Sequence, residues 1–184
     1  MARMTDIVYA ELDADQRRVY DAITAGPRGQ VQGPLRVWLQ SAPLADRAQA
    51  LGAFCRFGTS LPPRLSELAI LVTGAHWRAG FEWFAHAPLA VKAGIDAAAV
   101  EAIRVGRTPS FAQADEAAVY AFAHELLATR AVSDATYGEA VARLGKKAVV
   151  ELTGILGYYG LISMTIKAFE VPLPPGTPEP FADV

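Results

Sequence analysis

Apolar residues recur at intervals of three and four along most of the chain, and strand-like alternation is nearly absent. This spacing predicts amphipathic helices, and the many alanines favour the same state. The expected helices span about Asp13–Ala25, Leu35–Gln40, Pro43–Phe57, Leu65–Ala75, Glu82–Ala93, Asp96–Arg104, Asp115–Ala128, Asp134–Leu144 and Lys147–Phe169. The pattern therefore predicts an all-α protein.

Two segments interrupt the helical pattern. GPRGQVQGP (Gly26–Pro34) is rich in Gly and Pro and predicts a loop. VPLPPGTPEPF (Val171–Phe181) has five prolines in eleven residues, so it predicts an extended arm on the domain surface or on a neighbour. Neither is a linker between domains. We expect one domain over residues 1–184, with an N-terminal helix and loop in 1–33 and the arm in 171–184.

Composition narrows the possible partners. Of the 184 residues, 52% are hydrophobic and 20% are charged, and the formal net charge is −2. No basic stripe is present, which argues against nucleic acid, and the apolar runs are too short for a membrane span. The acidic first residues are unlike a secretory signal, and the single cysteine fits a cytoplasmic protein. The high apolar content predicts a homo-oligomer.

Residues 64–94 carry the candidate chemistry. Glu67 lies in a run that is apolar nearly all round, so a buried carboxylate is expected, and burial favours its protonated form. Glu82 and His86 stand four residues apart, so they share one helical face. Pro88 cannot donate a backbone hydrogen bond, which predicts a helix break or kink and a polar notch beside the histidine.

Two acids and an imidazole on adjacent helices are the parts of a proton relay. Structural interpretations stay open for each of them. Glu82 and His86 could form an exposed helical pair, and Glu67 could be a buried acid paired with Arg64 or Arg78.

The other reactive side chains have simple packing interpretations. His76 and Trp77 more often pack than react, His124 lies among alanines, and Cys55 is most simply a small buried apolar residue. The Glu-His pair supplies only two ligands of a possible zinc site, and no standard motif completes it. No metal is expected.

At this stretch the chain resembles the carboxymuconolactone decarboxylase family, which also contains the alkylhydroperoxidase AhpD-like proteins. Redox members carry Glu, eleven residues, and Cys-x-x-Cys-x-x-x-His. That Glu falls on Glu67 and the His on His86, while the cysteine positions fall on Ala79 and Glu82. The closing GYYGLISMTIKAFEVPLP (157–174) also resembles the last helix and arm of long family members. Disulfide-cycling peroxide reduction needs two thiols, so thiol peroxidase activity is disfavoured.

The resemblance implies an AhpD-like helical bundle, assembled as a trimer or hexamer, and a decarboxylase that needs no cofactor. Its substrate would be a small unsaturated lactone acid similar to 4-carboxymuconolactone, a compound of aromatic catabolism. His86 would donate the proton or contact the oxyanion, Glu82 would orient it, and Glu67 would be a second acid. The candidate substrate contacts are Arg64, His76, Trp77, Arg78, Trp83 and Tyr158.

Two alternatives stay open. The first is another cofactor-free lyase or isomerase of aromatic catabolism on the same scaffold, since a fold does not determine a reaction. The second is a non-catalytic helical oligomer that binds a small molecule.

Overall fold

The computed structural model describes residues 3 and 7–184, and all regular elements in this part are helical. The start of the expected N-terminal segment, at residues 1–2 and 4–6, lies outside the described residues. The elements are a short turn η1 (Tyr9–Glu11), α1 (Ala14–Ala25), α2 (Pro34–Trp38), α3 (Ala42–Ala53), a π-helical turn η2 (Phe54–Gly58), α4 (Pro63–His76), α5 (Gly80–Lys92), α6 (Ala97–Arg104), α7 (Ala114–Thr129), α8 (Asp134–Leu144) and α9 (Lys146–Phe169). The all-α prediction is confirmed.

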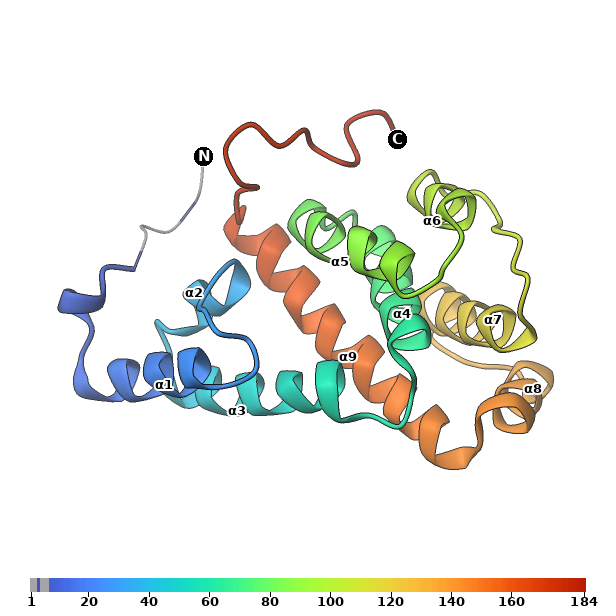
Figure 1. Ribbon diagram of the computed structural model, residues 1–184, viewed down its shortest axis with the longest axis horizontal. Helices are drawn as coiled ribbons and strands as arrows, with labels where there is room; N and C mark the ends of the chain where they lie inside the picture. The colour runs from blue at the N-terminus through green and yellow to red at the C-terminus, as the bar shows by residue number, and fades with distance from the viewer. Residues whose placement is uncertain (1–2, 4–6) are drawn as a thin grey trace.

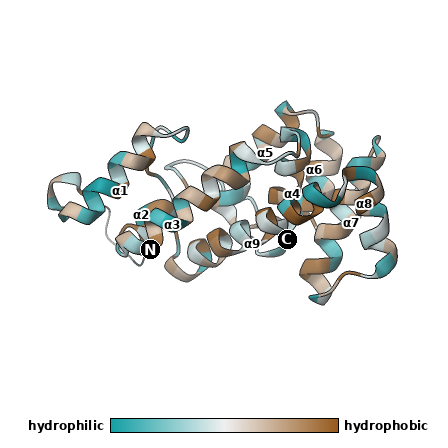
Figure 2. Cartoon of the chain, turned by 90° about the horizontal axis from the view of Figure 1, so that it is seen from below, coloured by the Kyte–Doolittle hydropathy of each residue, from teal (hydrophilic) through white to brown (hydrophobic). Residues whose placement is uncertain are grey.

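Two helices organise the core. The long α9 runs diagonally through the molecule, with α1–α3 on one side and α4–α8 on the other (Figure 1). α4 packs against α5, α7 and α9, and all its residues from Leu65 to Gly74 are buried. α4 is largely brown, hence apolar, in Figure 2, whereas α1 carries more teal residues. The buried helix expected around Glu67 is thus confirmed.

Local chemistry explains where the helices begin and end. Asp13 caps α1 in a reciprocal arrangement with Gln16, in which each side chain accepts from the other's backbone N–H. Pro63 occupies the first turn of α4, where no intrahelical donor is needed. Gly94, with a φ of 109°, ends the turn after α5 in a conformation that side chains disfavour.

The structure corrects two helix predictions. The expected helix Pro43–Phe57 divides into α3 and the π-helical turn η2, a change of hydrogen-bond register that no periodicity signals. Of the break or kink expected at Pro88, the break is wrong, because α5 continues through this residue to Lys92. α5 begins at Gly80, so Glu82 lies in its first turn.

The C-terminal arm lies on the domain surface. The ring of Phe181 packs edge-on against Trp83 of α5, with ring centroids 5.4 Å apart. Arg104 of α6 pairs with Asp183 and donates to the carbonyl of Pro180. The arm is therefore held against α5 and α6.

α9 also has the length and hydropathy of a membrane-crossing helix, with a mean hydropathy of 1.4 in its most apolar window. However, 61% of that window is buried inside the protein, as is usual for the core helix of a soluble protein. Its apolar residues are thus largely accounted for by internal packing.

Candidate functional site

Glu67, Glu82 and His86 converge in the interior. Glu67 projects from the buried helix α4, and Glu82 and His86 project from the face of α5 that packs on it. Their exposed fractions are 8%, 4% and 4%. The alternative in which Glu82 and His86 form an exposed pair is therefore wrong. The alternative in which Glu67 pairs with Arg64 or Arg78 is also wrong, because Glu67 pairs with His86.

The imidazole of His86 bridges the two carboxylates. Its Nδ1 lies 2.6 Å from Oε2 of Glu67, and its Nε2 lies 2.9 Å from Oε1 of Glu82. Burial alone would lower the pKa of His86, but the charges and polar contacts of Glu82 and Glu67 raise it to about 9. The imidazole is therefore an imidazolium at neutral pH, with both ring nitrogens as donors.

Glu82 is less completely satisfied than Glu67. Although Oε1 of Glu82 is close to Nε2 of His86, the contact lacks hydrogen-bond alignment, and this buried oxygen has no other partner among the described residues. Glu82 and His86 line a notch of about 50 Å³, which Glu67 does not reach. Glu82 thus carries a buried carboxylate oxygen without a well-aligned hydrogen bond and also lines this small space.

A larger cleft adjoins this notch. It has a volume of about 870 Å³ and lies among α2, η2, α5 and the start of the arm. The residues that line both spaces are Gln32, Arg56, Phe81 and Ala85. Apolar walls with a few polar groups are typical of small-molecule sites, so the cleft is a candidate entrance for substrate.

Arg28 and Arg56 bring positive charge to the notch. Arg28 donates from a terminal nitrogen to the hydroxyl of Tyr158 at 3.2 Å, while its buried Nε has no partner among the described residues. Gly52 is needed here, because a Cβ at this position would stand 2.0 Å from the Tyr158 hydroxyl. Arg56 comes from the π-helical turn and lines both spaces, so its guanidinium is placed to receive an anionic substituent.

Tyr159 forms the aromatic wall of the site. Its ring stands nearly perpendicular to the His86 imidazole, with centroids 5.3 Å apart, and it lines the notch. Burial raises the pKa of Tyr159 well above its ordinary value, so the phenol stays neutral. The neighbouring Tyr158, the expected substrate contact, packs instead against Trp38 and Tyr159.

The other expected substrate contacts lie elsewhere. Arg64 is held by Asp115 and Glu116 of α7, at 2.7 and 2.6 Å. Trp83 packs under Phe181 of the arm. Trp77 is half-buried against the core, and its ring lies edge-on to His76. His76 and Arg78 line a different cavity between α4, α6 and α7.

Sequence reasoning missed three residues at the notch, namely Arg28, Arg56 and Tyr159. Arg28 sits in the Gly/Pro loop and Arg56 in the π-helical turn, so helical periodicity cannot assign either of them a direction. Tyr159 could have been found, since the adjacent tyrosines of α9 point to different sides of the helix.

A thiol pair is absent from the site. Ala79 and Glu82 occupy the two positions where the redox motif has cysteines, and Cys55 is fully buried. Burial raises the pKa of the Cys55 thiol, which disfavours the reactive thiolate. In the described part of the chain, no group of three His, Cys, Asp or Glu side chains is arranged to hold a metal ion.

Solved structures resemble the whole chain. An alkylhydroperoxidase AhpD core, from an uncharacterized peroxidase-related protein of Ralstonia eutropha JMP134, superposes with a TM-score of 0.75 at 14% identity, over 98% of this chain and 94% of the other. A variant of the debrominase Bmp8 in complex with 2,3,4-tribromopyrrole also gives 0.75 at 14% identity, over 99% and 97%. An uncharacterized peroxidase-related protein from Silicibacter sp. TM1040 gives 0.73 at 12%, over 93% and 91%.

No protein-family model and no curated protein matches the sequence. At such low identity the structural likeness describes the fold and leaves the reaction open. The chain has the AhpD-like all-helical fold.

Proposed function

We propose that the protein is a cofactor-free lyase that decarboxylates a small unsaturated lactone acid similar to 4-carboxymuconolactone. The observation that carries this proposal is the buried imidazole held between two carboxylates beside the notch. Such an arrangement keeps a proton donor charged at neutral pH without any thiol. The adjoining cleft offers room for a ring with acidic substituents.

The proposed reaction has two steps. First, the bond between the ring carbon and the departing carboxylate breaks, and carbon dioxide leaves. The electron pair passes into the conjugated lactone carbonyl as a dienolate. Second, a proton from Nε2 of His86 forms the new C–H bond and restores the neutral lactone, and a solvent proton then returns to the imidazole. Stabilisation of the oxyanion and delivery of the proton are the protein's contributions.

The residues around His86 would have different roles in this reaction. Glu67 accepts from Nδ1 behind the ring, which orients the imidazole and stabilises its charged form. Glu82 shares the notch with Nε2 and is placed to pass the solvent proton back to it. This assignment reverses the expectation that Glu82 orients the histidine. Arg56, on the border of notch and cleft, would bind a substrate carboxylate.

Thiol peroxidase chemistry is disfavoured despite the names of the structural neighbours. That reaction needs a thiolate nucleophile and a resolving thiol. The chain has one cysteine, which is buried. A peroxide assay with a dithiol reductant should therefore show no catalytic consumption.

The test is a panel of unsaturated γ-lactone acids, followed by loss of absorbance and by release of carbon dioxide. The parent protein should turn over at least one of them, and His86→Asn and Glu82→Gln should lose roughly 10²-fold or more in kcat. Glu151→Gln is the matched control, because Glu151 is a buried glutamate of α9 that bonds to Ser60 away from the notch.

Two results would overturn the proposal. One is equal turnover by the folded His86 and Glu82 variants and the parent. The other is that the parent protein converts none of the compounds in the panel. Conversion of a panel member without release of carbon dioxide would instead favour the isomerase alternative.

A further inference from the structure

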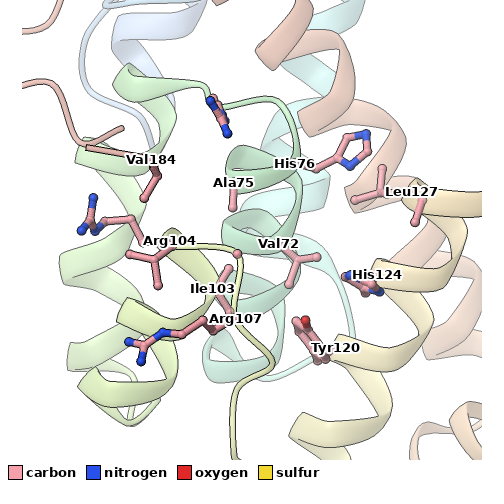
Figure 3. Close-up of a pocket in the computed structure, with 14 residues that line it drawn as sticks. Val72, Ala75, His76, Ile103, Arg104, Arg107, Tyr120, His124, Leu127 and Val184 are labelled. Carbon is pink, nitrogen blue, oxygen red and sulfur yellow. The ribbon is translucent and has the colours of Figure 1, made fainter. Parts of the chain in front are cut away.

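A second cavity lies between α4, α6 and α7 (Figure 3), and His86 is not among its lining residues. Its volume is about 260 Å³, and Val72, Ile103 and Leu127 contribute apolar walls. The proposed reaction uses none of its lining residues. The cavity is lined by His76 and Arg78, two residues that were expected to contact substrate.

Three arginines, Arg78, Arg104 and Arg107, contribute positive charge to the lining. Its basic side chains are His76, Arg78, Arg104, Arg107 and His124, and no Asp or Glu of the described chain is among the lining residues. The protein as a whole has a formal net charge of −2, so this local excess departs from the average of its surface. Such a site attracts anions.

Arg104 is already neutralised. It pairs with Glu101 and with Asp183 of the arm. Arg104 and, to a lesser extent, Arg107 lower the pKa of Glu101. In contrast, the exposed side chains of Arg78 and Arg107 form no ion pair among the described residues, so both guanidinium groups are free to bind an anion.

The backbone at Arg78 is strained. Its φ is 48°, in the left-handed region where glycine is favoured, at the turn that ends α4. A basic residue near a helix C-terminus also complements the helix dipole, but any position in the last turn could do this without strain. Arg130 and Glu170 have a similar positive φ but do not line this cavity, which makes Arg130 a matched reference for Arg78.

Aromatic rings form the opposite wall. Tyr120 and His124 stand one turn apart on α7, and their rings stack with centroids 5.4 Å apart at an angle of 25°. Figure 3 shows them across the cavity from Arg104 and Arg107. Burial raises the pKa of Tyr120, so the phenol adds no negative charge. Aromatic side chains of this kind favour edge-to-face or offset contacts with a further ring.

We propose that this cavity is a second binding site, for a small aromatic carboxylate. The ring would pack against Tyr120 and His124, the carboxylate would bind Arg78, and Arg107 would add positive charge to the lining. The volume of 260 Å³ is just below the usual range for drug-sized ligands, which matches a single-ring acid. This inference is independent of the proposed decarboxylase function.

Benzoate is the probe, and the histidine side chains report where it binds. The chain has three histidines, of which His76 and His124 line this cavity and His86 lies in the other site. Titration with benzoate, followed by NMR of the imidazole C–H groups, should shift the signals of His76 and His124 saturably. The His86 signal should not move. Benzamide, which lacks the charge, should bind more weakly.

The decisive variant is Arg78→Gly, since glycine relieves the strained backbone while removing the guanidinium. It should weaken benzoate binding roughly tenfold, the usual cost of losing a charged hydrogen bond. Arg130→Gly is the matched control, because Arg130 also has a positive φ, of 65°, at the end of α7 but does not line the cavity. Arg107→Gln should weaken binding as well.

Several outcomes would overturn the proposal. They are an absence of saturable shifts at His76 and His124, a shift confined to His86, and equal weakening by Arg78→Gly and Arg130→Gly.

Discussion

At the residue scale, the roles of the two carboxylates can be separated experimentally. Glu67 contacts only the rear nitrogen of His86, whereas Glu82 faces the notch. Glu67→Gln removes one cause of the raised pKa of His86, which is about 9 in the parent. The imidazole then loses its proton at lower pH, so the alkaline limb of the kcat profile should move to lower pH.

Glu151→Gln again serves as the control for loss of a buried carboxylate, and its pH profile should match the parent. An unchanged alkaline limb in Glu67→Gln would show that Glu67 does not set the protonation of His86.

The same imidazole links stability to pH. Its pKa rises from an ordinary 6.5 to about 9 on folding. A group whose pKa is higher in the folded than in the unfolded state stabilises the fold fully at pH values below its unfolded pKa. This contribution is lost as the pH rises through its folded pKa. The free energy of unfolding, measured with urea, should therefore fall between about pH 6.5 and pH 9, by an amount of the order of 3 kcal/mol.

His124→Asn, which removes an exposed imidazole, should keep this dependence, whereas His86→Asn should flatten it. A parent protein whose stability is constant across this window would argue against a charged His86.

At the element scale, the arm should behave as a strap that is anchored by Phe181. This ring is 7% exposed and packs on Trp83, while the preceding residues 171–175 border the large cleft. Phe181→Ala should release the arm, because its apolar anchor is lost. Hydrogen exchange in residues 171–184 should rise, and the free energy of unfolding should fall by roughly 1.5–3 kcal/mol, the usual contribution of one buried apolar side chain.

Tyr137→Ala, at an exposed aromatic of α8, is the control and should leave exchange in the arm unchanged. Equal exchange in parent and Phe181→Ala would mean that other contacts hold the arm.

Apolar spacing predicted most elements, since helices form close to the ranges expected for α1 and α4–α9. It also placed Glu82 and His86 on one face, because residues four apart must meet there. It failed at η2, where a π-helical turn shifts the register and delivers Arg56 to the notch. It gave no sign of the partners of Arg64 on α7, which stand 51 and 52 residues away in sequence and follow from tertiary packing alone.

At the scale of the whole molecule, exposed apolar side chains support the expected homo-oligomer. Leu51, Phe54 and Phe57, on α3 and η2, are 48%, 45% and 51% exposed. Phe84 and Phe169 at the large cleft are also exposed. Exposed apolar side chains in this number favour coverage by another subunit.

Sedimentation velocity over a dilution series should show a trimer or hexamer, and Phe54→Ser should shift the distribution toward smaller species. The polar substitution Gln40→Ser, at an exposed residue between α2 and α3, should leave this distribution unchanged. A parent protein that sediments as a monomer at all concentrations would contradict the expectation.

The central claim is that His86 is a charged proton donor because two buried carboxylates hold it. The most direct measurement is an NMR titration of its imidazole C–H signal, assigned by its absence in His86→Asn. The account predicts a pKa near 9, well above the ordinary 6.5. A midpoint at or below 6.5 would contradict it, since the imidazole would then be neutral at physiological pH.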